Sequence, residues 1–181
     1  LRIDHLRFQA AALDTLGEAL LRQGGLAEAV DHFERAVVAG RQAGDRWLES
    51  TALAHLATAL LDRGDAAASL GHLRRALAVA RELADRHAEA SVLNLLGRAR
   101  LELGDLAEAG RHLRHALELR ERVPDAYEEA ELHDNMGDLE SRSGRESVAA
   151  HHWELAAALY GKSGAPAEAE AVTGKVRSGR T

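Results

Sequence analysis

The chain has 181 residues, a formal net charge of −6 and no cysteine. The missing cysteines exclude disulfides and thiolate metal sites, and the acidic balance argues against a nucleic-acid surface, which needs basic groups to neutralise phosphates. Apolar residues make up 46 % of the chain but aromatic residues only 3 %, so we expect a core of Ala, Leu and Val in closely packed helices.

Apolar residues at helical spacing predict helices along the whole chain. The expected helices span residues 5–23, 26–43, 46–63, 66–83, 86–103, 106–122, 126–142, 146–162 and 166–177. Pro166 fits the first turn of the last helix, where its missing N–H donor is harmless. Aspartates that suit the N-cap position precede five of the others: Asp45, Asp65, Asp85, Asp105 and Asp125. We therefore predict an all-α protein of four antiparallel helix pairs and a terminal helix.

A repeat of forty residues organises these helices. Residues 103–117 read LGDLAEAGRHLRHAL, and the segments QGGLAEAVDHFERAV, RGDAAASLGHLRRAL and SGRESVAAHHWELAA begin at 23, 63 and 143. We predict a single array of four repeats, at about 5–43, 45–83, 85–123 and 125–163, followed by a capping helix over 166–177.

Several columns of this alignment have a direct physical reading. A small residue in mid-helix predicts close contact with a neighbouring helix, and it recurs as Gly17, Ala57, Gly97 and Gly137. Glycine at a helix end predicts a left-handed terminal residue, and it recurs as Gly24, Gly64, Gly104 and Gly144. The second helix of each pair has a large apolar residue with a small residue four positions before it and Ala three positions after it. The large residues are Phe33, Leu73, Leu113 and Trp153.

These columns resemble the tetratricopeptide repeat, which has a small residue at its eighth position, Ala at the twentieth and twenty-seventh, and a large apolar residue at the twenty-fourth. The resemblance implies a right-handed α-solenoid, with helices longer than in the usual unit of about 34 residues. The composition, rich in Ala, Arg, Leu and Gly, is similar to that of actinobacterial proteins. We expect a C-terminal array from a multidomain transcriptional regulator, cut from a longer chain because it begins at Leu1 without Met.

The resemblance also implies that the first helix of each repeat lines a concave groove. Residues at the groove positions differ between repeats, as expected for a surface shaped for one partner. The structural columns, in contrast, agree between repeats. The predicted partner-binding residues are Trp47, Thr51, Asn94, Arg98, Tyr127, Glu131, Asp134 and Asp138.

The pair on the third repeat has one functional reading, and the other two groups have two readings each. Asn94 and Arg98 lie one turn apart, suited to gripping a peptide backbone and a carboxylate. Trp47 and Tyr127 are either anchors for a partner side chain or packing against a neighbouring repeat. The acidic residues that follow Tyr127 either attract a basic helix or form a solvated face.

We therefore expect a cytoplasmic protein-interaction scaffold, or a regulatory or sensor domain, that binds a protein or peptide partner. The alternative is self-association, as a dimer or an end-to-end stack, through the N-terminal hairpin, where Ile3, Leu6 and Phe8 face an end that lacks a cap. In a longer protein the same residues would dock on an upstream domain. No direct nucleic-acid partner and no membrane span are expected, because no stretch reaches about 20 apolar residues.

Neither catalysis nor a cofactor is expected. The histidines His32, His72, His112 and His152 share one repeat column, but packed helices lie about 8–10 Å apart, too far for one zinc ion to join such positions. His115 lies one turn after His112 without an evident third ligand, so we predict no metal site. The segment YGKS at 160–163 lacks the first glycine and the preceding strand of a phosphate loop.

Overall fold

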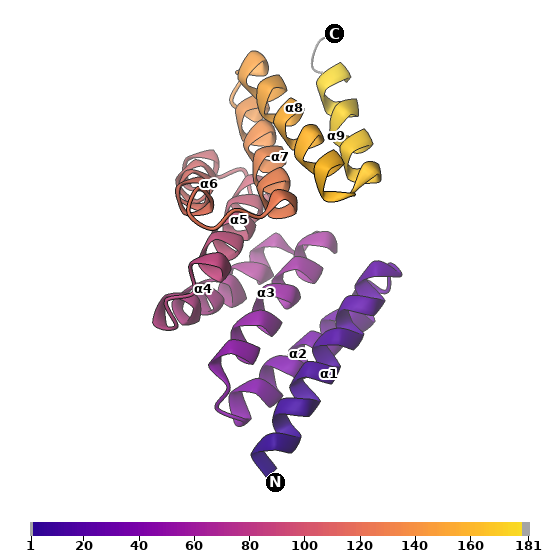
Figure 1. The fold of residues 1–181 in the computed structure, drawn as a ribbon, viewed down its shortest axis with the longest axis vertical. Coiled ribbons are helices and arrows are strands. Elements are labelled where there is room, and N and C mark those ends of the chain that lie inside the picture. The colour runs from indigo at the N-terminus through magenta and orange to yellow at the C-terminus, as the bar shows by residue number, and fades with distance from the viewer. Residues whose placement is uncertain (1, 179–181) are drawn as a thin grey trace. The chain divides into compact units, whose positions relative to one another are not determined.

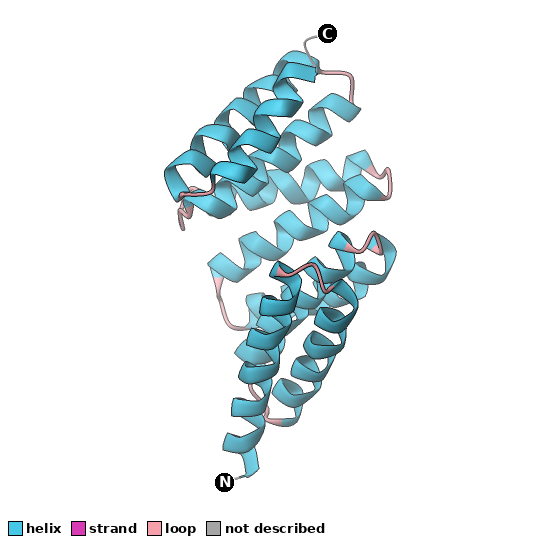
Figure 2. Cartoon of the chain, turned by 90° about the vertical axis from the view of Figure 1, so that its right-hand side faces the viewer, coloured by secondary structure: helices cyan, strands magenta, loops and turns pink. Residues whose placement is uncertain are grey.

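The structure is a computed structural model that describes residues 2–178, and over this range it contains helices joined by short loops and no strand (Figure 2). The helices are α1 (Arg2–Arg22), α2 (Leu26–Gln42), α3 (Arg46–Asp62), α4 (Ala66–Glu82), α5 (Arg86–Glu102), α6 (Leu106–Arg120), α7 (Ala126–Arg142), α8 (Glu146–Ser163) and α9 (Pro166–Ser178). Helices α2 to α9 begin at the predicted residues, whereas α1 begins three residues earlier than expected.

Two compact units divide the described residues, and the boundary between them falls after residue 95, within α5. In the first unit α1 packs against α2 and α3, and α3 packs against both α2 and α4. In the second unit α7 packs against α6 and α8, and α9 lies along α8 (Figure 1). Each unit therefore consists of antiparallel hairpins that bury their apolar faces against each other.

The small-residue column marks close contact within each hairpin, as predicted. A Cβ atom added at Gly137 would lie 2.4 Å from Cδ1 of the Trp153 ring. One added at Gly97 would lie 2.4 Å from Cδ2 of Leu113. In the three repeats where the small residue is glycine, it thus meets the large apolar residue of the second helix in the same repeat.

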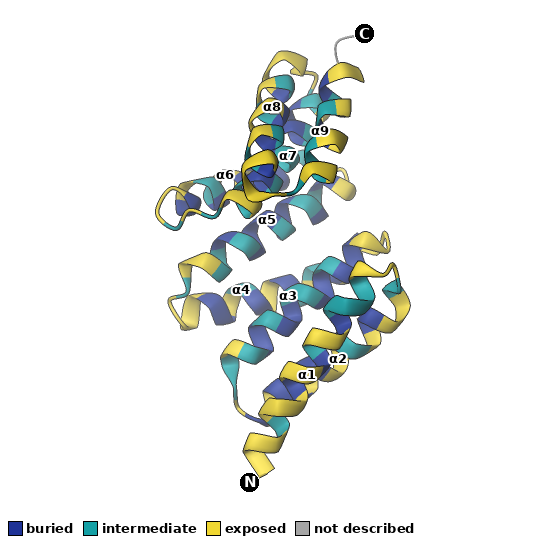
Figure 3. Ribbon diagram, turned by 45° about the vertical axis from the view of Figure 1, so that its right-hand side comes forward, coloured by how far each residue is buried: buried dark blue, intermediate teal, exposed yellow. Residues whose placement is uncertain are grey.

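The core of both units follows the repeat columns. The large apolar residue of the second helix is at most 5 % exposed in all four repeats. The alanine three residues later is fully buried each time, at Ala36, Ala76, Ala116 and Ala156. Figure 3 shows these buried faces turned toward neighbouring helices, with exposed residues on the outer faces and at the loops. Alanine keeps these helices close, because it adds little bulk at the contact.

The helix ends also follow the sequence prediction, with one substitution. The predicted glycines have positive φ, at Gly24 (79°), Gly64 (86°), Gly104 (78°) and Gly144 (76°). The turns at the other junction use the same left-handed residue, at Gly44 (68°) and Gly164 (79°). Ala84 takes this place after α4 with φ 53°, a conformation in which the Cβ of an L-residue is crowded.

Four of the five predicted aspartate caps are present. The carboxylates of Asp45, Asp85, Asp105 and Asp125 accept hydrogen bonds from backbone N–H groups in the first turn of the following helix. Asp65 was expected to do the same, and that expectation is wrong. Its carboxylate instead accepts a hydrogen bond from Arg63 Nε at 2.6 Å, which leaves the first turn of α4 without a side-chain cap.

Candidate binding surface

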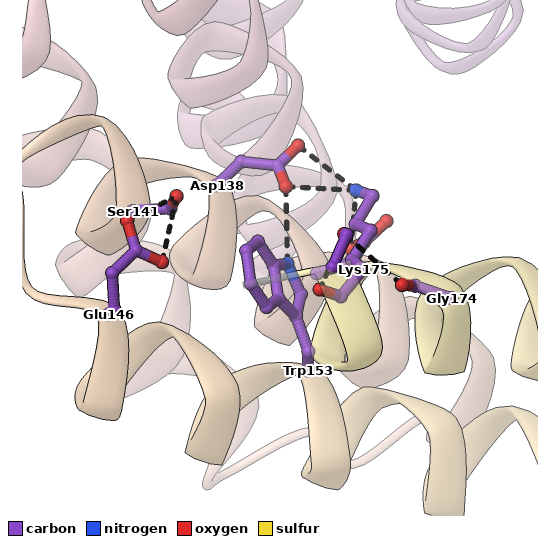
Figure 4. A network of polar contacts seen from close by, with 8 residues as sticks. Asp138, Ser141, Glu146, Trp153, Gly174 and Lys175 are labelled. Carbon is purple, nitrogen blue, oxygen red and sulfur yellow. Dashed lines mark hydrogen bonds and ion pairs between the residues drawn. The ribbon is translucent and has the colours of Figure 1, made fainter. Parts of the chain in front are cut away.

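Two of the acidic residues predicted for the fourth repeat, Asp134 and Asp138, contact the terminal helix α9. Lys175 Nζ donates a hydrogen bond to Asp134 Oδ1 at 2.7 Å and to Asp138 Oδ1 at 2.9 Å. The indole Nε1 of Trp153 donates to the same oxygen of Asp138 at 3.1 Å (Figure 4). These acids therefore already bind a cation from their own chain, which sequence reasoning did not anticipate.

Burial and the ion pairs act in opposite directions on the groups of this cluster. Burial lowers the pKa of Lys175, but the hydrogen bonds and charges of Asp134 and Asp138 outweigh burial, and the pKa is raised. Burial raises the pKa of Asp134, although Lys175 acts in the opposite direction. Because the ammonium of Lys175 already binds both Asp134 and Asp138, a basic group from a partner must displace Lys175 before it can reach these acids.

Tyr127, in the first turn of α7, packs on one side against its own unit. Its ring packs edge-on against Tyr160, with the ring centroids 5.4 Å apart and an interplanar angle of 72°. Tyr160 is buried, whereas Tyr127 stays 40 % exposed. Burial, followed by the charges of Glu131 and Glu168, raises the pKa of Tyr127. The ring is thus fixed on one side and open to solvent on the other.

In the first unit, Trp47 presents its side chain to solvent. It lies in the first turn of α3, after the N-cap Asp45, and is 57 % exposed. Thr51, one turn later on the same helix, is half-buried. An exposed indole beside a small polar residue suits contact with an apolar partner side chain.

The predicted pair on α5 needs correction at Asn94. This residue is only 6 % exposed, because its position on α5 falls within the buried face, so its amide is not presented to a partner. Arg98 belongs to the second unit and is half-buried, and its Nε donates to Glu102 Oε1 at 3.1 Å. Arg98 is thus held in an ion pair within its own helix.

A second polar cluster, in the first unit, was missed by the sequence reasoning. His55 Nδ1 on α3 lies 2.9 Å from Asp14 Oδ1, and His55 Nε2 lies 3.4 Å from Glu18 Oε1. The Phe33 ring packs against the imidazole, with the centroids 5.5 Å apart. Burial lowers the pKa of His55, but the hydrogen bond to Asp14 and the charges of both acids outweigh it and raise the pKa.

The two clusters share one sequence spacing. In each, two acids stand four residues apart on a first helix. A basic residue comes 41 residues after the first acid, on the first helix of the following pair or on α9. Comparing equivalent positions of the repeats could not reveal this, because the basic residue lies one position further along its repeat than the first acid does. The detectable signal was an acid at i and i+4 with a basic residue at i+41.

The second unit also contains a pair of histidines, of which His133 is buried and His152 half-buried. The Nδ1 atoms of His133 and His152 lie 3.0 Å apart, and the rings stack with centroids 5.2 Å apart. Burial, followed by the charges of His152 and His151, lowers the pKa of His133 to about 4. Burial also lowers the pKa of His152, and the two rings share one hydrogen bond.

A family model described as tetratricopeptide repeat matches residues 8–82, 48–122 and 88–162, each match displaced by one forty-residue unit from the last. The chain belongs to the tetratricopeptide repeat family. Membership of this family supports a role as a protein-interaction scaffold. A comparison with curated proteins gives no match.

Two solved structures show the same tetratricopeptide fold. A Rap protein complexed with Competence and Sporulation Factor aligns with a TM-score of 0.81 and 17 % identity, over 94 % of this chain and 52 % of the Rap chain. BtubC (BKLC) from P. vanneervenii aligns with a TM-score of 0.66 and 16 % identity, over 99 % of this chain and 87 % of that one. The chain thus has the helical solenoid fold, and it spans about half the length of the Rap protein.

In the part of the chain that the structure describes, none of the helices has the length and apolar character needed to cross a membrane.

Proposed function

We propose that this tetratricopeptide repeat chain is a non-catalytic interaction module that binds a peptide or helix of a protein partner along the first helices of its repeats. The observation that carries the proposal is the 57 % exposure of Trp47, a large aromatic side chain at a position where the other repeats carry different residues. Exposed aromatic residues of this kind are frequent anchors at protein interfaces.

The contacts we propose differ between the two units. In the first unit Trp47 is the apolar anchor and Thr51 a polar contact beside it. In the second unit the exposed side of Tyr127 provides a second anchor, with Glu131 and Arg98 as polar contacts. Since Lys175 occupies Asp134 and Asp138, those two acids contribute only to a partner whose basic group replaces the lysine.

We further propose that the module regulates or senses within a larger cytoplasmic protein, without direct contact with nucleic acid or membrane. The resemblance to actinobacterial multidomain transcriptional regulators supports this, and so does the Rap structure, which was solved as a complex with Competence and Sporulation Factor. In this proposal the array responds to the binding of the partner, or of an upstream domain of the same protein.

Selection from a displayed peptide library tests the binding mode. We expect the wild-type chain to enrich peptides with a shared apolar residue, and Trp47→Ala to weaken their binding by about tenfold or more, since anchor truncation costs about 2 kcal/mol or more. Leu83→Ala is the control, because Leu83 is an exposed apolar residue of the same unit at the end of a second helix. Equal loss in both variants, or no enriched peptide, would overturn the proposal.

A second candidate function, self-association through α1, has its own supporting observation. Ile3, Phe8 and Leu16 are 56 %, 77 % and 51 % exposed. The equivalent of Leu16 on α3 is Leu56, which is 1 % exposed. At Leu16, α1 thus exposes an apolar group that the following first helix buries, and a second copy of the chain would cover it together with its exposed apolar neighbours on α1.

A further inference from the structure

We propose that Asp14, Glu18 and His55 form a binding site for a divalent transition-metal ion between the first helices of the first two repeats. One possible ligand atom from each of the three residues lies within 4.8 Å of the other two. The two carboxylates stand one turn apart on α1, and the imidazole reaches them from α3. An ion held here would join the two helices directly.

The observed separations suit an ion of this kind. Metal–ligand bonds of about 2.0–2.2 Å place neighbouring ligands roughly 3–3.5 Å apart. Asp14 Oδ1 and Glu18 Oε1 lie 2.9 and 3.4 Å from the two nitrogens of His55. Each oxygen faces a different ring nitrogen here, so metal binding requires the imidazole of His55 to turn until a single nitrogen faces both acids.

The donor set selects the class of metal. One nitrogen and two carboxylate oxygens suit Zn²⁺, Co²⁺ or Mn²⁺, whereas Ca²⁺ and Mg²⁺ prefer oxygen ligands alone and soft ions prefer sulfur. Two carboxylate charges balance the charge of the ion. The side chains of His55 and Glu18 are 32 % and 38 % exposed, so water has access to the remaining coordination positions.

An independent observation comes from the second unit. There the acid pair Asp134 and Asp138, with the same sequence spacing, holds the ammonium of Lys175, which shows that the arrangement binds a cation. At the first-unit position the third residue is His55. Unlike lysine, a histidine loses its proton near neutral pH and then offers a lone pair to a metal ion.

The proton is the competitor for this site. Asp14 and Glu18 face both nitrogens of His55, and the Phe33 ring covers one side of the imidazole. Without metal, the imidazolium form satisfies both acids. Metal binding therefore releases a proton, and the affinity should rise as the pH increases through and above the ordinary histidine pKa of about 6.5.

Calorimetric titration of the full chain with Zn²⁺ tests the proposal. We expect one ion per chain in the wild type and a loss of affinity of about tenfold or more in His55→Gln. His112→Gln is the matched control, because His112 lies outside this cluster, with its Nε2 3.9 Å from the carboxylate of Glu108, and the variant should bind as the wild type does. Circular dichroism establishes that each variant keeps its helical content.

Two further measurements keep the result interpretable. Glu18→Gln removes a ligand but leaves the bond between Asp14 and His55, so it should weaken Zn²⁺ binding without unfolding the hairpin. Titration in buffers of different ionisation enthalpy should show proton release on binding, and a higher affinity at higher pH. The proposal is overturned if the wild type binds no Zn²⁺, if His55→Gln binds it unchanged, or if His112→Gln loses as much affinity.

Discussion

His133 stands where the three preceding repeats place leucine, at Leu13, Leu53 and Leu93. Burial and the neighbouring histidines lower its pKa to about 4, whereas in the unfolded chain it should be about 6.5. Between these values the unfolded chain binds more protons than the folded one. The stability that a neutral His133 permits is therefore present above pH 6.5 and is lost as the pH falls toward 4.

His133→Leu should remove this sensitivity to acid. Urea unfolding over a series of pH values should show a free energy of unfolding that falls less steeply between pH 6.5 and 4 than in the wild type. One pKa unit corresponds to about 1.4 kcal/mol, so the difference between the two proteins should reach a few kcal/mol at the acid end. The same change at exposed His5 is the control, and identical pH profiles for His133→Leu and wild type would contradict the interpretation.

The turn after α4 has alanine at the left-handed position where the equivalent turns have glycine. Ala84 has φ 53°, where Gly44 and Gly164 fill the equivalent places. The backbone N–H of Asp85 donates to Ala80 O at 2.9 Å, so the turn forms despite the crowded Cβ. The helix hydrogen bonds on either side hold this residue in a conformation that glycine adopts freely.

Ala84→Gly should stabilise the first unit by about 0.5–1 kcal/mol, because relief of the left-handed strain exceeds the added entropy of the unfolded chain. The reverse change, Gly44→Ala, places a Cβ in the same conformation and should destabilise by about 1 kcal/mol. Thermal unfolding of the two variants measures both effects. Shifts of the same sign in both would refute the argument.

The terminal helix α9 depends on its ion pairs as well as its apolar contacts. Lys175→Met should destabilise the protein by about 1–2 kcal/mol, less than for a fully buried pair because Lys175 and Asp138 are partly exposed. The pKa of Asp134 should rise further, since the charge that lowers it is removed; a carboxyl NMR titration measures this. Lys162→Met, at an exposed position on α8, should change neither property.

At the scale of the whole molecule, the repeat columns predicted most of the fold. Helix starts, left-handed turns and the Gly–Trp and Gly–Leu contacts depend on local chemistry that recurs every forty residues, and local chemistry is readable from one sequence. The cation clusters were not foreseen, because His55 and Lys175 act on acids of the preceding repeat in a different column. The burial of Asn94 likewise depends on packing between helices, which a comparison of repeat positions does not describe.

Self-association is a property of the whole chain and is tested by its mass in solution. If α1 is the interface, the wild type should exceed the 19.5 kDa of a single chain in light scattering at high concentration. Phe8→Asp should restore the single-chain mass, because a carboxylate on a buried apolar face is costly. Val148→Asp, at an exposed position on α8, should leave the mass unchanged, and a wild type that is already a single chain would exclude this function.

The two cation clusters also bear on how such arrays are rearranged. The core columns are nearly the same in every repeat, so by packing alone any hairpin could follow any other. His55 is matched only to a predecessor with Asp14 and Glu18, and Lys175 only to one with Asp134 and Asp138. A shuffled array that placed the second repeat after the third would set His55 against Asn94 and Arg98, a neutral amide and a like charge. At these two junctions the acid–base spacing thus favours the native order over a shuffled one.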